Sequence, residues 1–359
     1  MTCFDYSGVI HFHSAYSFDG TTPLSKIIEA AEDNGLDFLM LTDHSTLQAR
    51  TDGYEGWHGN VLLIVGQEVS PRFNHLLAFE TRTPIIVDKD DEEISPQSYI
   101  DRVNAEGGIS FLAHPDHEGT KLFHVKHYPW RDWTVEDYTG IGVWDFMTDW
   151  QSSLQGYTRA FMSYLWPGLF LRGPHPATLR KWDELNRHRR VVGIAECDNH
   201  ATTKRFWGLS FSVFSFRKAF RFLRTHILTR CPLSGDGVKD KILLIDALRR
   251  GNAYFAQESF FPAQGFRFSV GEGDHEAIMG DIFSLDQISR LIVTVPGNGY
   301  IRVVRDGVLY YETIGQSASC SIVQPGAYRV EVFVKRHGKY RPWIFSNPIY
   351  VNRLQTCSE

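Results

Sequence analysis

The chain has 359 residues, of which 43% are hydrophobic and 22% charged, and its formal net charge is −5. This composition is typical of a globular protein of about two domains, and the lack of a basic tail argues against a nucleic-acid partner. The five cysteines form no CxxC pair, which argues against a disulfide framework or a thiolate zinc site. The N-terminus has no signal-peptide pattern, and the aromatic stretch 161–171 is too short to cross a bilayer, so we expect a cytoplasmic protein with no membrane partner.

The first two-thirds of the chain alternate short apolar runs with helical patterns. A strand is predicted at VIHFH, and a helix at residues 23–35, with Pro23 in its first turn and Gly35 at its end. There follow strands at FLMLTDH and VLLIVGQE, a helix around SPQSYIDRVNAEGG, a strand at ISFLAHP, a helix at TLRKWDELNRH and a strand at VVGIAECDNH. Apolar runs separated by helices are typical of parallel strands covered on both faces, which predicts an α/β barrel or a doubly wound sheet.

The pattern changes from about Pro262 onward. Apolar residues now alternate with a period of two, and turns are predicted at Asp306-Gly307, Pro325-Gly326 and His337-Gly338. This predicts a small antiparallel β-sandwich. We place the boundary between Ala256 and Gly265, which gives domains 1–260 and 261–359.

Residues that can bind metal ions follow the predicted strands of the first domain. They are His11 and His13, Asp43 and His44, Glu68, His114, and Asp198 and His200. Because the carboxyl ends of parallel strands share one rim, we expect these side chains to converge. Imidazole with carboxylate and no thiolate suits Zn, Mn or Fe in a hydrolytic site, and a carboxylate such as Glu68 can bridge two ions.

Each of these motifs also has an ordinary structural interpretation. The His11-Phe12-His13 pair taken alone is more often two polar residues at a strand end, and Thr42-Asp43 also fits a turn or a helix cap. The shared position after an apolar run favours a metal centre.

Six segments, HFHSAYSFDG, LTDH, GQEVS, NHLLAF, FLAHP and ECDNH, occur in this order. In this the sequence resembles the PHP (polymerase and histidinol phosphatase) domain of metal-dependent phosphoesterases. The resemblance implies a distorted seven-stranded (β/α) barrel. The stretches YTGIGVWDFMTDW, KWDELN, RTHIL, MGD and RPWIFSNPIYV look like one branch of that superfamily, the CehA/McbA-type metallohydrolases related to a carbaryl hydrolase.

The resemblance also implies a set of metal ligands. It assigns His11, His13, Glu68 and Asp198 to a first ion, Glu68, His75 and His114 to a second, and Asp19, His44 and His200 to a third. His75 and Asp19 are assigned by the resemblance alone. The segment SFDG departs from the commoner SDG because Phe18 intervenes, and in ECDNH the residues Glu196 and Cys197 stand where small residues are more usual.

The expected function is hydrolysis by a metal-bound hydroxide at a centre of two or three divalent ions, Mn, Fe or Zn. Glu68, Asp198 and His200 are the expected catalytic residues, and the expected partner is a small-molecule substrate. A phosphoester is favoured, and a carbamate or carboxyl ester is the alternative. A non-catalytic binding protein and a proofreading exonuclease are weaker hypotheses, because the ligand set is complete and no basic stripe is present.

Further residues have two interpretations each. Asp43 either orients a ligand histidine or stabilises its loop. His117, His124 and His127 either line the substrate pocket or are polar loop residues, and His226 is interpreted as structural. The aromatic stretch from WDFMTDWQSS to YLWPGLFL predicts a lid over the pocket or a helix packed on the barrel.

Overall fold

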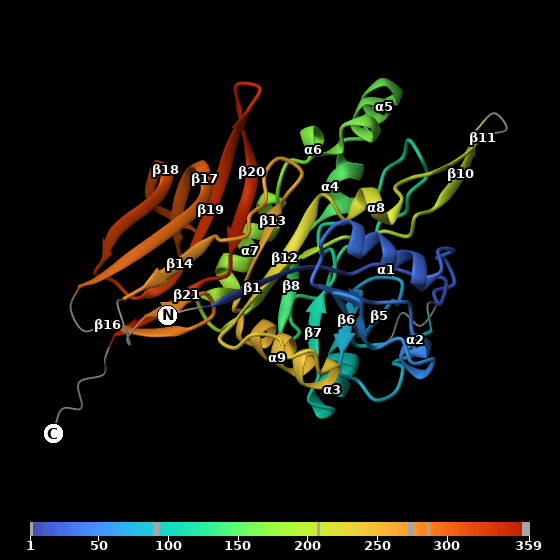
Figure 1. The fold of residues 1–359 in the computed structure, drawn as a ribbon, viewed down its shortest axis with the longest axis horizontal. Coiled ribbons are helices and arrows are strands. Elements are labelled where there is room, and N and C mark those ends of the chain that lie inside the picture. The colour runs from blue at the N-terminus through green and yellow to red at the C-terminus, as the bar shows by residue number, and fades with distance from the viewer. Residues whose placement is uncertain (1–2, 89–93, 207–208, 272–275, 286–287, 354–359) are drawn as a thin grey trace.

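The computed structural model describes residues 3–88, 94–206, 209–271, 276–285 and 288–353. It is a mixed α/β molecule in which the N-terminal part carries most of the helices and the C-terminal part is rich in β-strands (Figure 1). No helix within these ranges combines the length and the apolar character that a bilayer crossing needs.

The first strands of the N-terminal part form a sheet that is parallel at its centre. Strands β1 (Phe4–Ile10), β2 (Phe38–Leu41) and β4 (Val61–Val65) pair in parallel, and helix α1 (Leu24–Asp33) connects the first two. The edge strand β3 (Gly56–His58) is antiparallel to β4. On the other side β12 (Leu223–Thr229) is antiparallel to β1, and β13 (Ala253–Gln257) is antiparallel to β12.

A second sheet contains β5 (Gln67–Val69), β6 (Leu76–Phe79), β7 (Ile109–Leu112), β8 (Gly140–Asp145) and β9 (Val192–Glu196). Strands β7, β8 and β9 are parallel, whereas β6 is antiparallel to both of its neighbours. Two isolated bridges, His44 to Glu68 and Phe12 to Asn199, link the two sheets. The expected parallel arrangement is therefore incomplete, because the sheets also contain the antiparallel strands β6 and β12, which the sequence analysis did not predict. The six residues between β5 and β6 are too few for the crossover that a parallel pair requires.

Helices lie where the sequence predicts them for α1, α3 (Pro96–Ala105) and α7 (Pro176–Asn186). Ser95 caps α3 by accepting a hydrogen bond from the backbone of Gln97, as expected for a serine before an apolar periodic run. The other helices are α2 (Gln48–Thr51), α4 (Phe146–Ser152), α5 (Tyr157–Leu165), α6 (Pro167–Phe170), α8 (Phe216–Ala219) and α9 (Gly237–Arg250). A short hairpin, β10 (Thr203–Phe206) and β11 (Leu209–Ser212), extends from the same part of the molecule (Figure 1).

The C-terminal strands are β14 (Arg267–Val270), β15 (Ala277–Ile278), β16 (Ile282–Leu285), β17 (Ser289–Arg305), β18 (Val308–Ile322), β19 (Gly326–Arg336), β20 (Lys339–Ser346) and β21 (Ile349–Arg353). Two of the predicted turns, Asp306-Gly307 and His337-Gly338, join hairpins, and both residues of each turn have positive φ. All pairs are antiparallel except β16 with β21.

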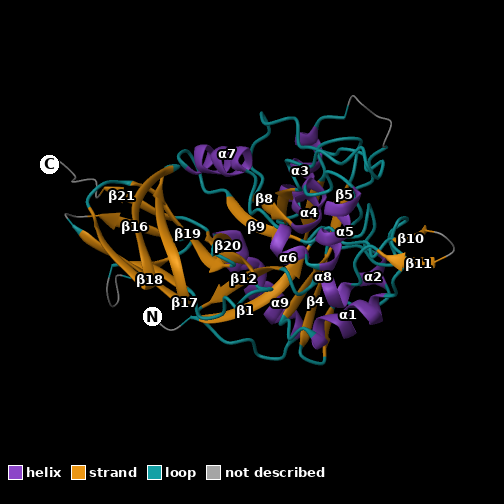
Figure 2. Ribbon diagram, turned by 90° about the horizontal axis from the view of Figure 1, so that it is seen from above, coloured by secondary structure: helices purple, strands orange, loops and turns teal. Residues whose placement is uncertain are grey.

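The two parts of the chain share strand pairing although each has its own core. Strand β20 pairs with β13, so the backbone hydrogen bonds continue across the segment between Ala256 and Gly265. The cluster of buried apolar residues in the C-terminal part is drawn almost entirely from residues after Tyr254. Figure 2 shows the C-terminal strands beside the helical part, with α7 near the junction.

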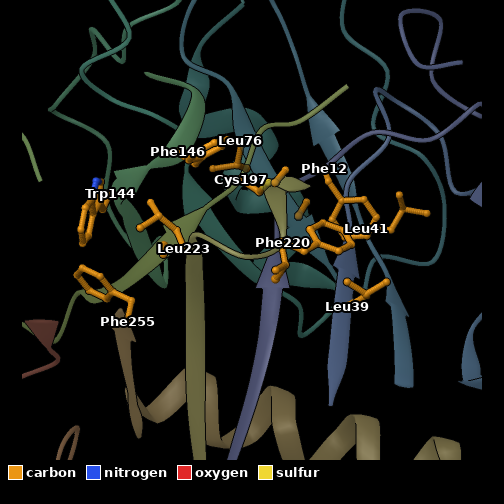
Figure 3. Close-up of a cluster of buried hydrophobic side chains, with 14 of the residues drawn as sticks. Phe12, Leu39, Leu41, Leu76, Trp144, Phe146, Cys197, Phe220, Leu223 and Phe255 are labelled. Atoms are coloured by element: carbon orange, nitrogen blue, oxygen red, sulfur yellow. The ribbon is translucent and has the colours of Figure 1, made fainter. Parts of the chain in front are cut away.

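Buried apolar side chains separate the ends of the strands from the helices. Phe12 and Cys197, each flanked on both sides by polar residues, point into a core that also contains Phe146 and Phe220 (Figure 3). His11 and His13, which flank Phe12, point away from this core toward Glu68. Glu196 and Asp198, which flank Cys197, both face His11, so the cysteine in ECDNH is a core residue.

Candidate metal centre

All nine residues assigned as ligands lie together in space. The described part of the chain contains four overlapping groups whose ligand atoms are within 4.8 Å of one another. The groups are His13, Asp19, His44 and His200; His11, His114 and Asp198; His11, His13 and Glu68; and Glu68, His75 and His114.

Different elements bring these side chains to one place. His11, His44, His114 and Asp198 each follow the end of a parallel strand within three residues. His75 precedes β6, and because β6 is antiparallel, its first residues lie at the rim where its neighbours end. The sequence analysis looked for residues that follow a strand, and for this reason it did not find His75, which precedes one.

Three of the candidate ligands have a left-handed backbone, with φ of 67° at His11, 29° at His114 and 46° at Asp198. Residues other than glycine adopt positive φ at a cost in conformational free energy, and such residues are concentrated at functional sites. The positive φ values mark the points where the chain leaves the strands and turns its side chains toward the centre.

Glu68 lies at the middle of the centre and is 1% exposed. Its Oε2 atom is 3.4 Å from His11 Nε2, 3.3 Å from His13 Nε2 and 3.1 Å from His44 Nδ1. Its Oε1 atom is 2.7 Å from His75 Nδ1 and 3.3 Å from His114 Nε2. The two carboxylate oxygens thus face two different sets of histidines.

Asp198 completes the first set, because its Oδ1 atom is 3.4 Å from both His11 Nε2 and His13 Nε2. These two histidine nitrogens are buried and have no hydrogen-bond partner in the described part of the chain. Two ligands that bind one ion at about 2.1 Å with tetrahedral angles are about 3.4 Å apart. Nitrogen and oxygen atoms at this spacing fit a divalent cation better than they fit direct hydrogen bonds to each other.

The third set lies toward the surface. Asp19 Oδ2 is 3.1 Å from His44 Nε2 and 3.3 Å from His200 Nε2. The ring of His13 stacks between those of His44 and His200, at centroid distances of 4.4 and 4.1 Å. His44 faces Glu68 with one nitrogen and Asp19 with the other, so it links the third set to the first.

Residues around the centre fix the orientation of the histidines. Glu196 accepts a hydrogen bond from His11 Nδ1 at 3.0 Å and another from the backbone N–H of His114 at 2.8 Å. Protonation of His11 at Nδ1 leaves Nε2 unprotonated and directed at Glu68 and Asp198. Asp43 accepts two hydrogen bonds from Ser14, both of 2.6 Å, so it stabilises the loop rather than a ligand ring.

The acidic residues of the centre are held in their ionised form. Burial alone would raise the pKa of Glu68, but the facing His44, His75 and His11 hold it well below its usual range. Burial is likewise outweighed at Asp198, whose pKa is lowered by His11 and His13. Ionised carboxylates buried among unpaired imidazole nitrogens attract cations.

Asp145 is a residue of the same rim that the sequence analysis missed. It is the last residue of β8, between the strands that precede His114 and Asp198. Its Oδ2 atom caps α4 by accepting from the backbone of Thr148, whereas buried Oδ1 has no hydrogen-bond partner among the described residues. Burial, reinforced by Asp198 and Glu196, raises its pKa to about 8. Its position after the apolar run GIGVW is the signal that would have identified it.

The remaining histidines are not part of the four groups. His117 is buried, with its ring 5.4 Å from that of His114, whereas His124 and His127 are exposed. His226 is buried between Asp5 and Glu258, at 2.8 and 3.0 Å, which agrees with its interpretation as structural.

The family model of the PHP domain matches residues 10–126, which is less than half of the chain. The matched segment contains seven of the nine candidate ligands and ends before Asp198 and His200. No match appears among curated proteins.

The chain is similar to a two-domain protein from Bacteroides vulgatus ATCC 8482 that contains a predicted PHP-like metal-dependent phosphoesterase (13% identity, TM-score 0.40, 96% of this chain and 95% of that chain). It is also similar to an endonuclease Q in complex with duplex DNA carrying an abasic lesion (11% identity, TM-score 0.40, 69% and 56%). A third similar structure, from Bifidobacterium adolescentis ATCC 15703, is a candidate metal-dependent phosphoesterase (15% identity, TM-score 0.34, 57% and 92%). Similarities at this level do not determine a reaction, and the absence of a nucleic-acid partner stays a prediction.

Proposed function

We propose that this protein is a metal-dependent hydrolase that cleaves a phosphoester of a small molecule. The observation that carries the proposal is the set of four N···O distances of 3.3 to 3.4 Å that join His11 and His13 to Glu68 and Asp198. The two nitrogens involved lack hydrogen-bond partners among the residues that the structure describes, and each is a competent ligand for Mn, Fe or Zn.

The proposal gives each set of residues one ion. His11, His13, Glu68 and Asp198 hold the first, Glu68, His75 and His114 the second, and Asp19, His44 and His200 the third. When bound, the ions supply positive charge to the reacting oxygen atoms and acidify a water molecule.

The positions of three side chains support the catalytic roles that we propose for them. Glu68 has one oxygen in each of two sets, so it fixes their separation. Asp198 is 14% exposed at its side chain, and its carboxylate would accept the proton of the reacting water molecule when the ions are bound. His200, 21% exposed at its side chain, lies at the outer edge of the centre, where it would face a bound substrate.

We further propose that the two N-terminal sheets form the distorted barrel of the PHP type and that residues 261–359 form a β-sandwich domain. The CehA/McbA-type resemblance keeps an aryl carbamate or carboxyl ester as the alternative substrate. Both reactions use the same nucleophile, so the substrate panel must contain both.

Metal content and hydrolysis test the proposal together. Purified protein is depleted of metal, reloaded with Mn²⁺, Fe²⁺ or Zn²⁺, and assayed on p-nitrophenyl phosphate, a bis-aryl phosphodiester and an aryl carbamate. We expect about two or three ions per chain and hydrolysis that depends on them. Removal of a residue that only orients a ligand lowers metal affinity or activity roughly 10- to 100-fold. Because Asp198 is a proposed ligand itself, Asp198→Ala should lower kcat/KM by about 100-fold or more.

The control is Asp101→Ala, which removes an exposed carboxylate on α3. Circular dichroism establishes that both variants are folded. A folded Asp198→Ala protein with full activity would refute the proposed mechanism, and a metal-loaded protein that hydrolyses none of the substrates would favour a binding function.

A further inference from the structure

Two loops cover one side of the candidate metal centre. The first connects β5 to β6 and carries Arg72 and Phe73 next to His75. The second follows His114 and carries Tyr128 and Arg131. Asn74 joins them, because its side-chain oxygen accepts hydrogen bonds from the backbone N–H groups of Arg131, at 2.6 Å, and Asp132, at 3.1 Å. These hydrogen bonds hold the backbones of the two loops together, so the loops form one wall.

This wall carries two arginines stacked on one aromatic ring. The guanidinium carbon of Arg72 is 4.3 Å from the centroid of Phe73, and that of Arg131 is 3.2 Å from the same centroid. Within the described ranges neither guanidinium forms an ion pair with a carboxylate. Arg72 donates one hydrogen bond, of 3.1 Å, to the backbone oxygen of His127, which leaves its other N–H groups available.

Tyr128 lies between this arginine pair and the metal centre. Its ring is 5.2 Å from that of His75, and the guanidinium carbon of Arg72 is 5.4 Å from the Tyr128 centroid. The backbone N–H of Tyr128 donates to His117 Nδ1 at 3.2 Å, which fixes the residue against the buried side of the loop. A row of neighbouring side chains thus leads outward from the candidate ligands, from His75 to Tyr128, then to Arg72 and, across Phe73, to Arg131.

Two positive charges this close repel each other, and cation–π contacts with Phe73 offset only part of that cost. An anion that binds both guanidinium groups would remove the repulsion. Guanidinium groups present paired N–H donors that match the oxygens of a phosphoryl group, and this match favours a phosphoryl group over a neutral ester.

We propose that Arg72, Arg131 and Tyr128 form an anion subsite at the mouth of the metal centre, and that this subsite selects substrates bearing a phosphoryl group over neutral carbamates and esters. The inference rests on the proposed function for the reaction. The binding of a phosphoryl group by the subsite does not depend on turnover.

Anion binding is measured first, by isothermal titration of the full-length, metal-loaded protein with inorganic phosphate at low ionic strength. We expect Arg72→Gln and Arg131→Gln each to raise the Kd for phosphate by about tenfold, since each loses one charge-assisted contact worth about 1.5 kcal/mol. Arg180→Gln, which removes an exposed arginine on α7, is the matched control and should leave the Kd unchanged. Equal Kd values in all four proteins would overturn the inference, whether or not the protein is a hydrolase.

Selectivity is measured second, on the neutral p-nitrophenyl acetate and on a p-nitrophenyl phosphodiester that carries a second, terminal phosphoryl group, so that one phosphoryl group can react at the metal centre while the other binds the arginines. Arg72→Gln should raise KM for the phosphodiester by about tenfold with kcat changed less than about twofold, and leave kcat/KM for the acetate unaltered. Arg72→Lys should recover part of the phosphodiester KM, because it keeps the charge but loses the paired donors. An equal loss on both substrates would show a structural role for Arg72 and contradict the subsite. Failure of the proposed function would give a different result, because the wild-type protein itself would then bind no metal ions or hydrolyse none of the substrates.

Discussion

The orientation of His11 depends on a carboxylate outside the nine assigned ligands. Glu196 uses Oε1 for His11 Nδ1 and Oε2 for the backbone N–H of His114. A glutamine at this position has only one oxygen acceptor, so one of the two donors would face an amide N–H.

We therefore expect Glu196→Gln to weaken metal affinity by roughly 10- to 100-fold, the usual effect of losing a partner that orients a ligand. Competition with a chromophoric chelator measures the affinity. The control is Glu184→Gln, an exposed glutamate on α7. An unchanged affinity in folded Glu196→Gln protein would show that the ring of His11 is positioned without Glu196.

At this scale the sequence predicted the strand-end histidines but not the residues that orient them. His11, His44 and His114 follow apolar runs, which is a visible pattern, whereas Glu196 lies inside such a run and reads as an irregularity. Glu196 acts as an acceptor because β9 pairs with β8 and the residues after β9 bond to the end of β1. No local signal in the sequence predicts these neighbours.

At the scale of elements, three strands are joined by a buried charged network. His226 of β12 lies between Asp5 of β1 and Glu258, which follows β13, and Tyr254 of β13 stacks on the His226 ring at 4.4 Å. The Tyr254 hydroxyl donates to Asp5, and Arg224 and Arg267 pair with Glu258 and Asp5. The network fixes β12 and β13 against the first strand.

Replacement of His226 by glutamine should leave two buried carboxylates with less positive charge around them. We expect His226→Gln to lower the free energy of unfolding by about 3–5 kcal/mol, because Asp5 and Glu258 lose one partner of a buried ion pair. Urea unfolding measures the free energy. A loss below about 1 kcal/mol would show that the arginines suffice.

The same network predicts how stability changes with pH. Burial lowers the pKa of His226, but its hydrogen bonds to Asp5 and Glu258 raise it to about 9, above its ordinary value of 6.5. A group whose pKa is higher in the folded state contributes fully below its unfolded pKa, and the contribution is lost as pH rises through the folded pKa. The free energy of unfolding should therefore fall between about pH 6.5 and 9, and this fall should be smaller in His226→Gln. Identical pH profiles for the two proteins would contradict the assignment.

The helices α1, α3 and α7 and the turns at Asp306-Gly307 and His337-Gly338 were predictable because their signals are local. A periodic apolar face marks α3, and an Asp-Gly or His-Gly pair between alternating runs marks each turn. The direction of β6 was not predictable in this way. A continuous buried run such as Leu76–Phe79 has the same apolar pattern in a parallel or an antiparallel strand.

At the scale of the whole molecule, a buried ion network connects the two parts. Arg329 of β19 donates two hydrogen bonds, of 2.6 and 2.8 Å, to Asp183 of α7, and a third, of 2.7 Å, to Glu331. The side chain of Asn347 bonds to both backbone groups of Gly193 in β9. Together with the β13–β20 pairing, these contacts predict that the two parts unfold together.

Arg329→Met should leave Asp183 and Glu331 buried without their cation and destabilise the protein by about 3–5 kcal/mol. Scanning calorimetry should show one transition in the wild-type protein, shifted to lower temperature in the variant, and an unshifted transition in Arg290→Met, which alters an exposed residue of β17. Two resolved transitions in the wild-type protein would contradict the coupling. The period-two pattern predicted the C-terminal strands but not this attachment, because Asp183 and Gly193, which bind Arg329 and Asn347, lie more than 100 residues away in the sequence.

The location of bound ions tests the central claim most directly. Crystals grown with Mn²⁺ and measured near the manganese absorption edge should show an anomalous peak about 2.0–2.2 Å from His11 Nε2, His13 Nε2 and Asp198, and a second about 3.5–4 Å away beside Glu68, His75 and His114. Crystals that show no anomalous peak among these residues, or show peaks only elsewhere, would contradict the account.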